Sequence, residues 1–324
     1  MKTKLLTILL FAINLSIYSQ NITESKTITL PGLKCANISP DNTMIMIGKT
    51  NGTIEVYSLE TGTKKYGIKL QTDEINSITY NKNGQYFLSA STDNSTMIWK
   101  CADGKLLKSI KKQPSSVWTS AISANNKYIA SGLENGAIKI WEASTVKEYR
   151  ILYGHSQRVF EIAFTSDSKY LVSCSKDNTI KIWDYAQNLC INTLKGHENE
   201  VRSISISPDD KIIASASKDN TIKLWNLQTG AEINSLRGHT WWITSVSFSP
   251  DAKYMISSSS REIILWDTES GNILQKVQAH KDVDNVNVRF SRDGKYIISY
   301  DKNCAKIWTT GLIFSTLNDN KKEK

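Results

Sequence analysis

The hydrophobic pattern of the chain alternates every second residue in short segments, which is typical of β-strands with one buried face. The stretch from 159 to 194 contains four such segments: Val159–Phe164, Tyr170–Ser173, Thr179–Trp183 and Cys190–Leu194. Turn residues separate them, and the repeated part of the chain shows no helical spacing of apolar residues. We therefore expect an all-β fold built from four-stranded antiparallel units.

Two sequence markers recur at a nearly fixed spacing. An aromatic residue ends a strand-like segment at intervals of 42, 42, 42, 42, 41 and 42 residues, at Tyr57, Trp99, Trp141, Trp183, Trp225, Trp266 and Trp308. A turn residue recurs every 42 residues, at Asp41, Asn83, Asn125, Asp167, Asp209, Asp251 and Asp293. Seven copies of one all-strand unit predict a seven-bladed β-propeller that forms a single domain.

The repeats resemble those of the WD40 family. The resemblance rests on Gly-His pairs, Ser-Pro-Asp turns and Trp-Asp pairs, found at Gly154-His155, Gly196-His197, Gly238-His239, Ser39-Pro40-Asp41, Ser207-Pro208-Asp209, Ser249-Pro250-Asp251, Trp183-Asp184 and Trp266-Asp267. It covers residues 27 to about 317. It implies a seven-bladed propeller of four-stranded antiparallel blades that serves as a binding platform, without implying an enzymatic activity.

The resemblance also implies a structural role for residues that look like a catalytic triad. In well-formed WD40 blades a His, a Ser or Thr, an Asp and the Trp form hydrogen bonds in series. Blades four and five keep this set, as His155, Ser173, Asp177 and Trp183 and as His197, Ser215, Asp219 and Trp225. A second set 42 residues after the first indicates architecture, because a hydrolase needs one nucleophile beside one oxyanion hole.

The other blades depart from this pattern. Arg261 stands at the Asp position of blade six, Asp301 is displaced in blade seven, and blades one to three lack the Gly-His pair. We therefore expect only two of the seven blades to keep the full network.

Two segments compete to supply the outer strand of the last blade. Thr27–Gly32 aligns with Asn192–Gly196 of blade four, and Leu312–Leu317 competes for the same place. Closing the ring protects a sheet edge that would otherwise pair with other chains. We favour the N-terminal segment.

The N-terminus has the features of a cleavable secretory signal. Lys2 and Lys4 precede an apolar run from Leu5 to Ile17, and Ser19 is a small residue suited to cleavage. The run is short for a membrane span, and a buried N-terminal strand or helix is the alternative. We expect a signal over residues 1–19, a linker over 20–26, the propeller over 27–317 and a charged tail over 318–324. The chain is then exported, periplasmic or extracellular, and does not span a membrane.

Charge and chemical motifs narrow the function further. The net charge of +9 is spread over 324 residues, which is a weak signal for nucleic acid, so we do not expect a nucleic-acid partner. There is no phosphate loop, dinucleotide fingerprint, His-Glu-x-x-His or Cys-x-x-Cys motif, so we expect no catalytic residues, no cofactor and no metal site. Among the five cysteines, Cys174 and Cys190 lie too far apart for a bridge, whereas a Cys35–Cys304 disulfide is conceivable because blades one and seven adjoin.

The resemblance implies where a partner binds. In WD40 propellers the residue after the first apolar position of the innermost strand, and the residue two before it, typically point to one face around the opening. This rule selects Asn76, Glu74, Trp118, Ser116, Phe160, Arg158, Arg202, Glu200, Thr244 and Trp242, and neighbouring turns add Lys176, Lys218 and Arg261.

Three of the nine tryptophans are not blade anchors, namely Trp118, Trp241 and Trp242. Exposed aromatic and Arg side chains are typical of binding hot spots. We expect Trp118, Phe160 and Trp242 to form one accessible patch that binds a protein or peptide. Packing of these aromatic side chains between blades is the structural alternative.

Two other functions remain open. An enzyme on the propeller scaffold would need acids converging on the channel, and the candidates are Glu74, Glu200, Asp282 and Asp284. A polyanion- or glycan-binding module would use the basic residues Arg158, Lys176, Arg202, Lys218 and Arg261.

Overall fold

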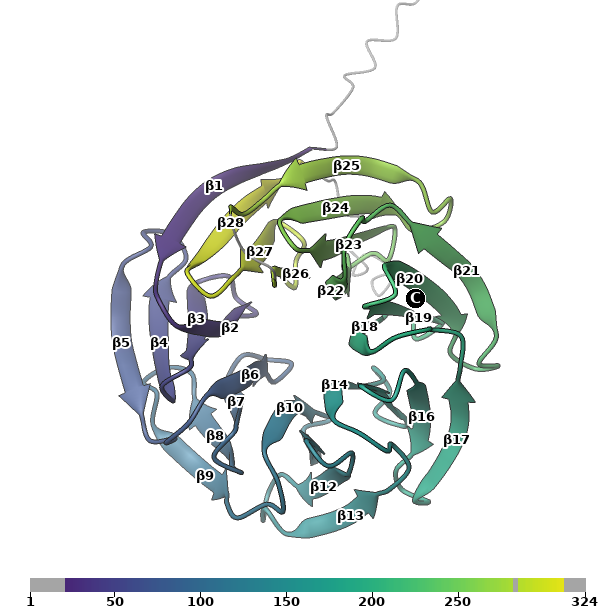
Figure 1. The fold of residues 1–324 in the computed structure, drawn as a ribbon. Coiled ribbons are helices and arrows are strands. Elements are labelled where there is room, and N and C mark those ends of the chain that lie inside the picture. The colour runs from purple at the N-terminus through teal and green to yellow at the C-terminus, as the bar shows by residue number, and fades with distance from the viewer. Residues whose placement is uncertain (1–20, 282–284, 312–324) are drawn as a thin grey trace, which may run out of the picture.

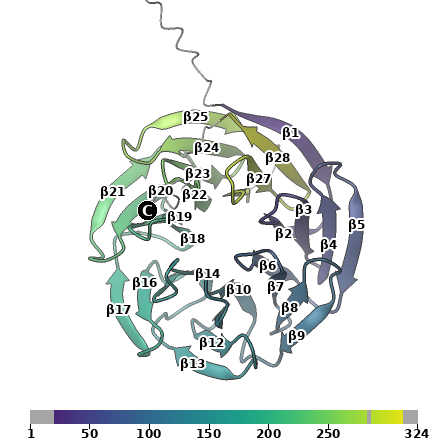
Figure 2. The same ribbon diagram turned by 180° about the vertical axis from the view of Figure 1, so that it is seen from behind.

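The computed structural model describes residues 21–281 and 285–311, and these residues form strands and turns without a helix. Within these two ranges, twenty-eight strands build seven four-stranded antiparallel sheets, which are arranged as blades around a central opening (Figure 1, and from behind in Figure 2). The predicted seven-bladed propeller is confirmed. Within the described ranges there is no helix that is long and apolar enough to cross a membrane.

Each blade contributes strands at four distances from the axis. The innermost strands, from blade one to blade seven, are β2 (Leu33–Ile38), β6 (Ile75–Tyr80), β10 (Val117–Ile122), β14 (Val159–Phe164), β18 (Val201–Ile206), β22 (Ile243–Phe248) and β26 (Asn287–Phe290). The second strands are β3 (Met44–Lys49), β7 (Tyr86–Ser91), β11 (Tyr128–Leu133), β15 (Leu171–Ser175), β19 (Ile212–Ser217), β23 (Tyr254–Ser259) and β27 (Tyr296–Tyr300).

The outer half of each blade follows the same order. The third strands are β4 (Thr53–Ser58), β8 (Thr96–Lys100), β12 (Ile138–Glu142), β16 (Ile180–Asp184), β20 (Thr221–Asn226), β24 (Glu262–Asp267) and β28 (Cys304–Thr310). The outermost strands are β5 (Lys64–Lys69), β9 (Leu106–Ile110), β13 (Glu148–Leu152), β17 (Leu189–Leu194), β21 (Glu232–Arg237), β25 (Ile273–Gln278) and, for blade seven, β1 (Ile22–Thr29). In blade four, all four predicted strands are present, with ends displaced by two residues at most.

The hydrophobic core lies mainly between neighbouring blades. One cluster joins Ile140 and Leu152 of blade three to Val159 and Trp183 of blade four, all of them buried. The second strands are almost wholly buried, as in β15, because both of their faces pack against a neighbouring blade, whereas the innermost strands, such as β14, are only partly buried where they line the channel. The sheets therefore stack side by side around the ring.

The recurring turn residues hold the tight turns between the first and second strands. In blade five, Asp209 Oδ1 accepts hydrogen bonds from Ser207 Oγ at 2.7 Å and from the Lys211 amide at 3.3 Å. The next residue, Asp210, has a positive φ of 57°, and Asn or Asp tolerates this conformation better than most residues. The 42-residue turn marker thus reports one backbone geometry repeated in every blade.

The N-terminal strand closes the ring. β1 pairs with β28 from Ile22 opposite Thr310 to Thr29 opposite Cys304, which confirms the favoured segment. The strand begins at Ile22, so residues 22–26 of the expected linker belong to the propeller, because Ile22 itself is buried in the core. The competing segment 312–317, the predicted signal 1–19 and the charged tail 318–324 lie outside the described residues.

All five cysteines are free, so the conceivable Cys35–Cys304 disulfide is not formed. Cys35 lies on an innermost strand, whereas Cys304 begins the third strand of its blade. Cys35 Sγ donates instead to the carbonyl oxygen of Ile75 at 3.3 Å, and Cys304 lies beside His280. The two thiols therefore belong to different layers of the ring.

Candidate binding face at the channel mouth

A β-bulge occurs at the same place in the innermost strands of blades one to six. The pairing between the innermost strand and the next strand of the blade shifts register at the second residue of the innermost strand. In β10 this shift lies between Val117 and Thr119. The bulged residues are Lys34, Asn76, Trp118, Phe160, Arg202 and Thr244. A bulge redirects a side chain out of the regular alternation. All of them except Lys34 line the central cavity of about 400 Å³.

Aromatic and guanidinium groups stack on one another at this cavity. Trp118 and Phe160 meet edge to face, with ring centroids 6.2 Å apart. The Arg158 guanidinium lies 3.7 Å from the Trp118 ring centroid and 5.5 Å from that of Phe160. Arg202 lies 4.2 Å from the Phe160 ring, and the Lys34 ammonium 5.3 Å from the Trp118 ring. Such contacts hold long side chains in one geometry and leave the rings half-buried.

Carboxylates hold the basic groups of the cluster in place. Glu134 accepts from both Nε and Nη2 of Arg158, at 2.5 and 2.8 Å. Glu74 pairs with Lys34 at 2.6 Å. This bidentate and paired arrangement preorganises the surface before a partner arrives.

Glu200 connects blade five to the outer part of the face. Its Oε2 lies 3.3 Å from Arg202 Nη1 and 3.0 Å from Lys218 Nζ. Burial opposes ionisation of Glu200, but the hydrogen bond and charge of Lys218 outweigh it and lower the pKa. The Lys218 ammonium then lies 4.6 Å from the ring of Trp242.

The structure places the three expected aromatic residues in two groups. Trp118 and Phe160 are in direct contact, whereas Trp242 of blade six is linked to Phe160 through Arg202, Glu200 and Lys218. Trp242 is 49% exposed and its neighbour Trp241 is 64% exposed. We call this set the channel-mouth cluster: Lys34, Trp118, Arg158, Phe160, Glu200, Arg202, Lys218, Trp241 and Trp242.

The remaining predicted residues lie around the cluster. Lys176 and Arg261 are exposed, and Arg261 borders with Trp241 a surface cavity of about 520 Å³ on blade six. Asn76 is engaged internally, since its Nδ2 donates to Thr92 Oγ1 and to the Val117 carbonyl, each at 2.9 Å. Thr244 Oγ1 donates to the carbonyl of Val286 in blade seven.

Sequence reasoning missed several charged residues of this region. Lys34 holds in blade one the position that was selected in the other blades, so the same rule applied there finds it. Glu134 lies in the turn between β11 and β12, and Glu161 and Arg289 face the channel from blades four and seven. No local motif marks these three residues.

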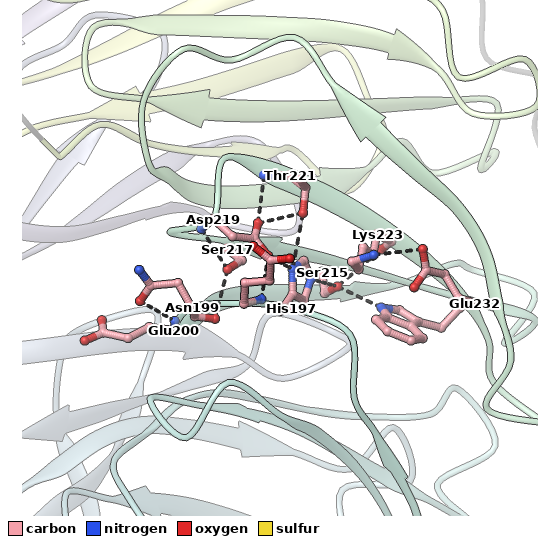
Figure 3. A network of polar contacts seen from close by, with 11 residues as sticks. His197, Asn199, Glu200, Ser215, Ser217, Asp219, Thr221, Lys223 and Glu232 are labelled. Atoms are coloured by element: carbon pink, nitrogen blue, oxygen red, sulfur yellow. Dashed lines mark hydrogen bonds and ion pairs between the residues drawn. The ribbon is translucent and has the colours of Figure 1, made fainter.

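Buried polar chains fix the geometry of the blades behind this face. In blade five, His197 Nδ1 donates to Asp219 Oδ2 at 2.7 Å, and Ser215 Oγ donates to His197 Nε2 at 2.7 Å (Figure 3). Trp225 Nε1 donates to Ser215 Oγ at 2.8 Å. Blade four repeats this arrangement with His155, Ser173, Asp177 and Trp183.

Comparison with known families agrees with this repeated geometry. Five segments match the family described as WD40, or WD domain, G-beta repeat: residues 63–100, 104–142, 146–184, 188–226 and 230–267. Together they cover more than half of the chain. The chain belongs to the WD40 repeat family. No curated protein matches the sequence significantly.

The WD40 network extends to more blades than expected. In blade six Glu262 replaces the usual aspartate, and His239 Nδ1 donates to its Oε1 at 2.8 Å. In blade seven His280 Nδ1 donates to Asp301 Oδ2 at 2.6 Å despite the displaced sequence position. Their serines, Ser257 and Ser299, accept from Trp266 and Trp308. The expectation that only two blades keep the network was therefore wrong.

Blade two keeps a related chain without histidine. Trp99 Nε1 donates to Ser89 Oγ at 2.8 Å, and Ser89 Oγ donates to Gln71 Oε1 at 2.5 Å. Gln71 Nε2 then donates to Ser95 Oγ at 2.9 Å. A neutral amide thus takes the place of the imidazole in this WD40 blade.

These networks do not offer a nucleophile to a substrate. Ser173 and Ser215 are fully buried, and each seryl oxygen already accepts a hydrogen bond from a tryptophan. Of the acids proposed for catalysis, Glu74 and Glu200 are paired with basic groups, and Asp282 and Asp284 lie outside the described residues.

Proposed function

We propose that this WD40 propeller is a non-enzymatic platform that binds a protein or peptide through the channel-mouth cluster. WD40 propellers typically bind proteins and act as scaffolds. The observation that carries the proposal is the chain of stacked groups from Lys34 through Trp118, Arg158 and Phe160 to Arg202. It continues through Glu200 and Lys218 to the exposed Trp242.

The physical argument concerns the entropy cost of binding. Trp and Arg side chains supply most hot-spot energy at protein interfaces, because they bury a large area. Stacking on the rings and pairing with Glu134 already restrict Arg158 before binding. Few side-chain torsions therefore remain to be fixed when a partner binds, which lowers the entropy cost of binding.

Pairing of the basic residues favours this function over polyanion binding. Arg158 pairs with Glu134, and Arg202 and Lys218 share Glu200, so two carboxylates compensate part of the charge of these three residues. An enzymatic role finds less support, since Glu74 and Glu200 are both held in ion pairs with basic side chains.

Export belongs to the same proposal. The closing strand β1 begins at Ile22, so cleavage after Ser19 leaves every residue of that strand in the mature chain. Expression in a secreting host tests this directly. The exported chain is expected to begin at Gln20 by mass spectrometry, and a retained residue 1–19 segment would contradict export by a cleaved signal.

A quantitative capture experiment tests the binding face. Wild type, Trp118→Ala/Trp242→Ala and the control Leu107→Ala/Ile233→Ala are compared as baits under identical conditions. The control changes two exposed apolar residues on the outer strands β9 and β21. We expect at least a tenfold loss of the recovered protein partner only in the tryptophan variant, which corresponds to about 1.4 kcal/mol.

Two results contradict the proposal. Equal recovery of the partner by wild type and the tryptophan variant would show that the partner does not bind at the channel mouth. Binding that disappears steeply with added salt and extends to any polyanion indicates an electrostatic module instead.

A further inference from the structure

Three groups able to ligate a metal meet in blade seven. His280 Nδ1, Asp301 Oδ2 and Cys304 Sγ all lie within 4.8 Å of one another, and across residues 21–281 and 285–311 this is the one such group of three. Cys304 Sγ lies 3.5 Å from His280 Nδ1 and 3.6 Å from Asp301 Oδ2. The imidazole and the carboxylate are 2.6 Å apart.

Blade seven has the same His-Asp-Ser-Trp network as blades four and five, but it contains a thiol where those blades have a hydroxyl. In blades four and five the equivalent position is occupied by Thr179 and Thr221. Thr179 Oγ1 lies 2.6 Å from Asp177 Oδ1 and 3.3 Å from His155 Nδ1, so its hydroxyl completes a purely polar network. At Cys304 the same place in the network is taken by a soft sulfur ligand.

We propose that His280, Asp301 and Cys304 bind a divalent transition-metal ion of the zinc class. Imidazole nitrogen, carboxylate oxygen and thiolate sulfur are the three ligand types that zinc uses in proteins. With bond lengths of about 2.0 Å to N and about 2.3 Å to S, adjacent ligands of a tetrahedral site lie about 3.5 Å apart. The two sulfur distances of 3.5 and 3.6 Å already have this length.

The third edge of the site changes when the metal enters. The Nδ1–Oδ2 distance of 2.6 Å is that of a hydrogen bond, and it must widen by about 0.7 Å when the ion replaces the shared proton. The imidazole proton then moves to Nε2, which faces Ser299 Oγ at 2.8 Å and can donate to it. That contact orients the ring, as outer hydrogen bonds of metal-ligating histidines do.

The backbone positions the carboxylate for this role. Asp301 Oδ1 accepts from the amides of Asn303 and Cys304 at 2.6 and 2.9 Å, which leaves Oδ2 directed at the other two ligands. His280 and Asp301 are buried, whereas Cys304 is only half-buried. The side of the thiol therefore gives access to the ion and to a water molecule as fourth ligand.

The ligand set also balances the charge of a divalent cation. A thiolate and a carboxylate together carry two negative charges, so the filled site is a neutral complex, and binding of the ion releases the thiol proton.

Cobalt(II) titration of the full chain tests the site. The chain is reduced, freed of metal by a chelator and titrated with Co²⁺ as a spectroscopic probe. Wild type is expected to bind one equivalent with a thiolate-to-cobalt charge-transfer band, to release one proton per ion from the thiol, and to lose the band when Zn²⁺ is added.

Two variants provide matched controls. Cys304→Thr restores the residue found in blades four and five, so we expect it to fold and to lose the band. Cys190→Ser removes the other half-buried thiol, whose hydrogen-bond partners are the Asn192 carbonyl and Thr193 Oγ1, and should keep the band. A zinc-dependent rise in unfolding temperature should follow the band.

Specific results overturn the proposal. Absence of the band or of proton release in the wild-type chain is sufficient to overturn it, even if Cys304→Thr fails to fold. A band that survives in Cys304→Thr, or one that disappears in Cys190→Ser, places the metal elsewhere.

Discussion

Arg289 donates a hydrogen bond to Glu161 across the central channel, so a salt bridge joins blade seven to blade four. Their strands, β26 and β14, face each other over the opening in Figure 1. Glu161 also accepts from Ser203 Oγ at 2.7 Å and from the Ile204 amide at 3.0 Å. The Glu161 charge raises the pKa of Arg289 above its ordinary value. One carboxylate therefore connects three blades.

Glu161→Ala should destabilise the propeller more than Arg289→Ala. Removing Glu161 deprives two donors of blade five of their acceptor and leaves Arg289 unpaired, at a cost of about 2 kcal/mol. The Arg289 side chain is 40% exposed to the channel, so solvent screening limits its own contribution to less than about 1 kcal/mol. Urea unfolding of both variants measures the difference. Equal losses would show that the salt bridge, and not the blade-five contacts, dominates.

A pair of tryptophans isolates the contribution of the network hydrogen bond. Trp225 Nε1 donates to Ser215 Oγ, whereas Trp141 Nε1 in blade three is buried without a hydrogen-bond partner in the described structure. Both rings lie beneath a lysine, Lys223 and Lys139. Trp225→Phe should therefore cost about 1–2 kcal/mol more than Trp141→Phe, because only the first change breaks a hydrogen bond.

Chemical denaturation of the two variants against wild type gives this difference. The shared loss of ring volume cancels in the comparison. A larger loss for Trp141→Phe would mean that packing in blade three outweighs the network bond.

The fold follows from the sequence because each marker reports one fixed geometry. Asp209 and its equivalents hold the same turn, and Trp183 and its equivalents end the same strand, so their 42-residue spacing counts the blades. The 42-residue spacing did not predict the hydrogen-bond network of blade six. Glu262 lies one residue after the expected position and reaches His239 because its side chain is one methylene longer than that of aspartate.

The positions that the WD40 resemblance selects have a common structural feature, whereas their contacts were not predicted. Trp118, Phe160 and Arg202 each stand at the β-bulge that recurs at the same place in the innermost strands. The cross-channel pair of Glu161 and Arg289 joins residues 128 positions apart, and only closure of the ring brings them together. Single-residue patterns contain no information about such a distance.

Acid should destabilise the propeller in two steps. Burial lowers the pKa of His155, His239 and His280, so their neutral forms favour folding, and this contribution is lost as pH falls below about 6.5. Burial opposes ionisation of Asp177 and Asp219, but hydrogen bonds, above all from His155 and His197, lower their pKa values. Their contribution is present above about pH 3.9 and is lost as pH falls further.

His239→Gln separates the histidine step from the carboxylate step. Gln71 shows that a glutamine can hold this place in a blade, accepting from serine through Oε1 and donating through Nε2. Between pH 6.5 and 5 the variant should lose less stability than wild type, by up to about 1.4 kcal/mol per pH unit for the one proton removed. Urea unfolding at several pH values measures both slopes. Parallel slopes would show that His239 does not titrate on unfolding in this window.

Because β1 closes the ring, we expect truncation of the N-terminus to destabilise the propeller and truncation of the C-terminus to leave its stability unchanged. A chain that starts at Leu30 loses the pairing with β28 and the burial of Ile22 and Ile28, each worth roughly 1.5–3 kcal/mol. It also exposes the edge of β28, which invites pairing with a second chain. We expect a loss of more than about 3 kcal/mol in unfolding free energy and self-association by light scattering. A chain that ends at Gly311 keeps β1 in place and should unfold like the full chain. Greater damage from the C-terminal truncation would instead assign ring closure to residues 312–317.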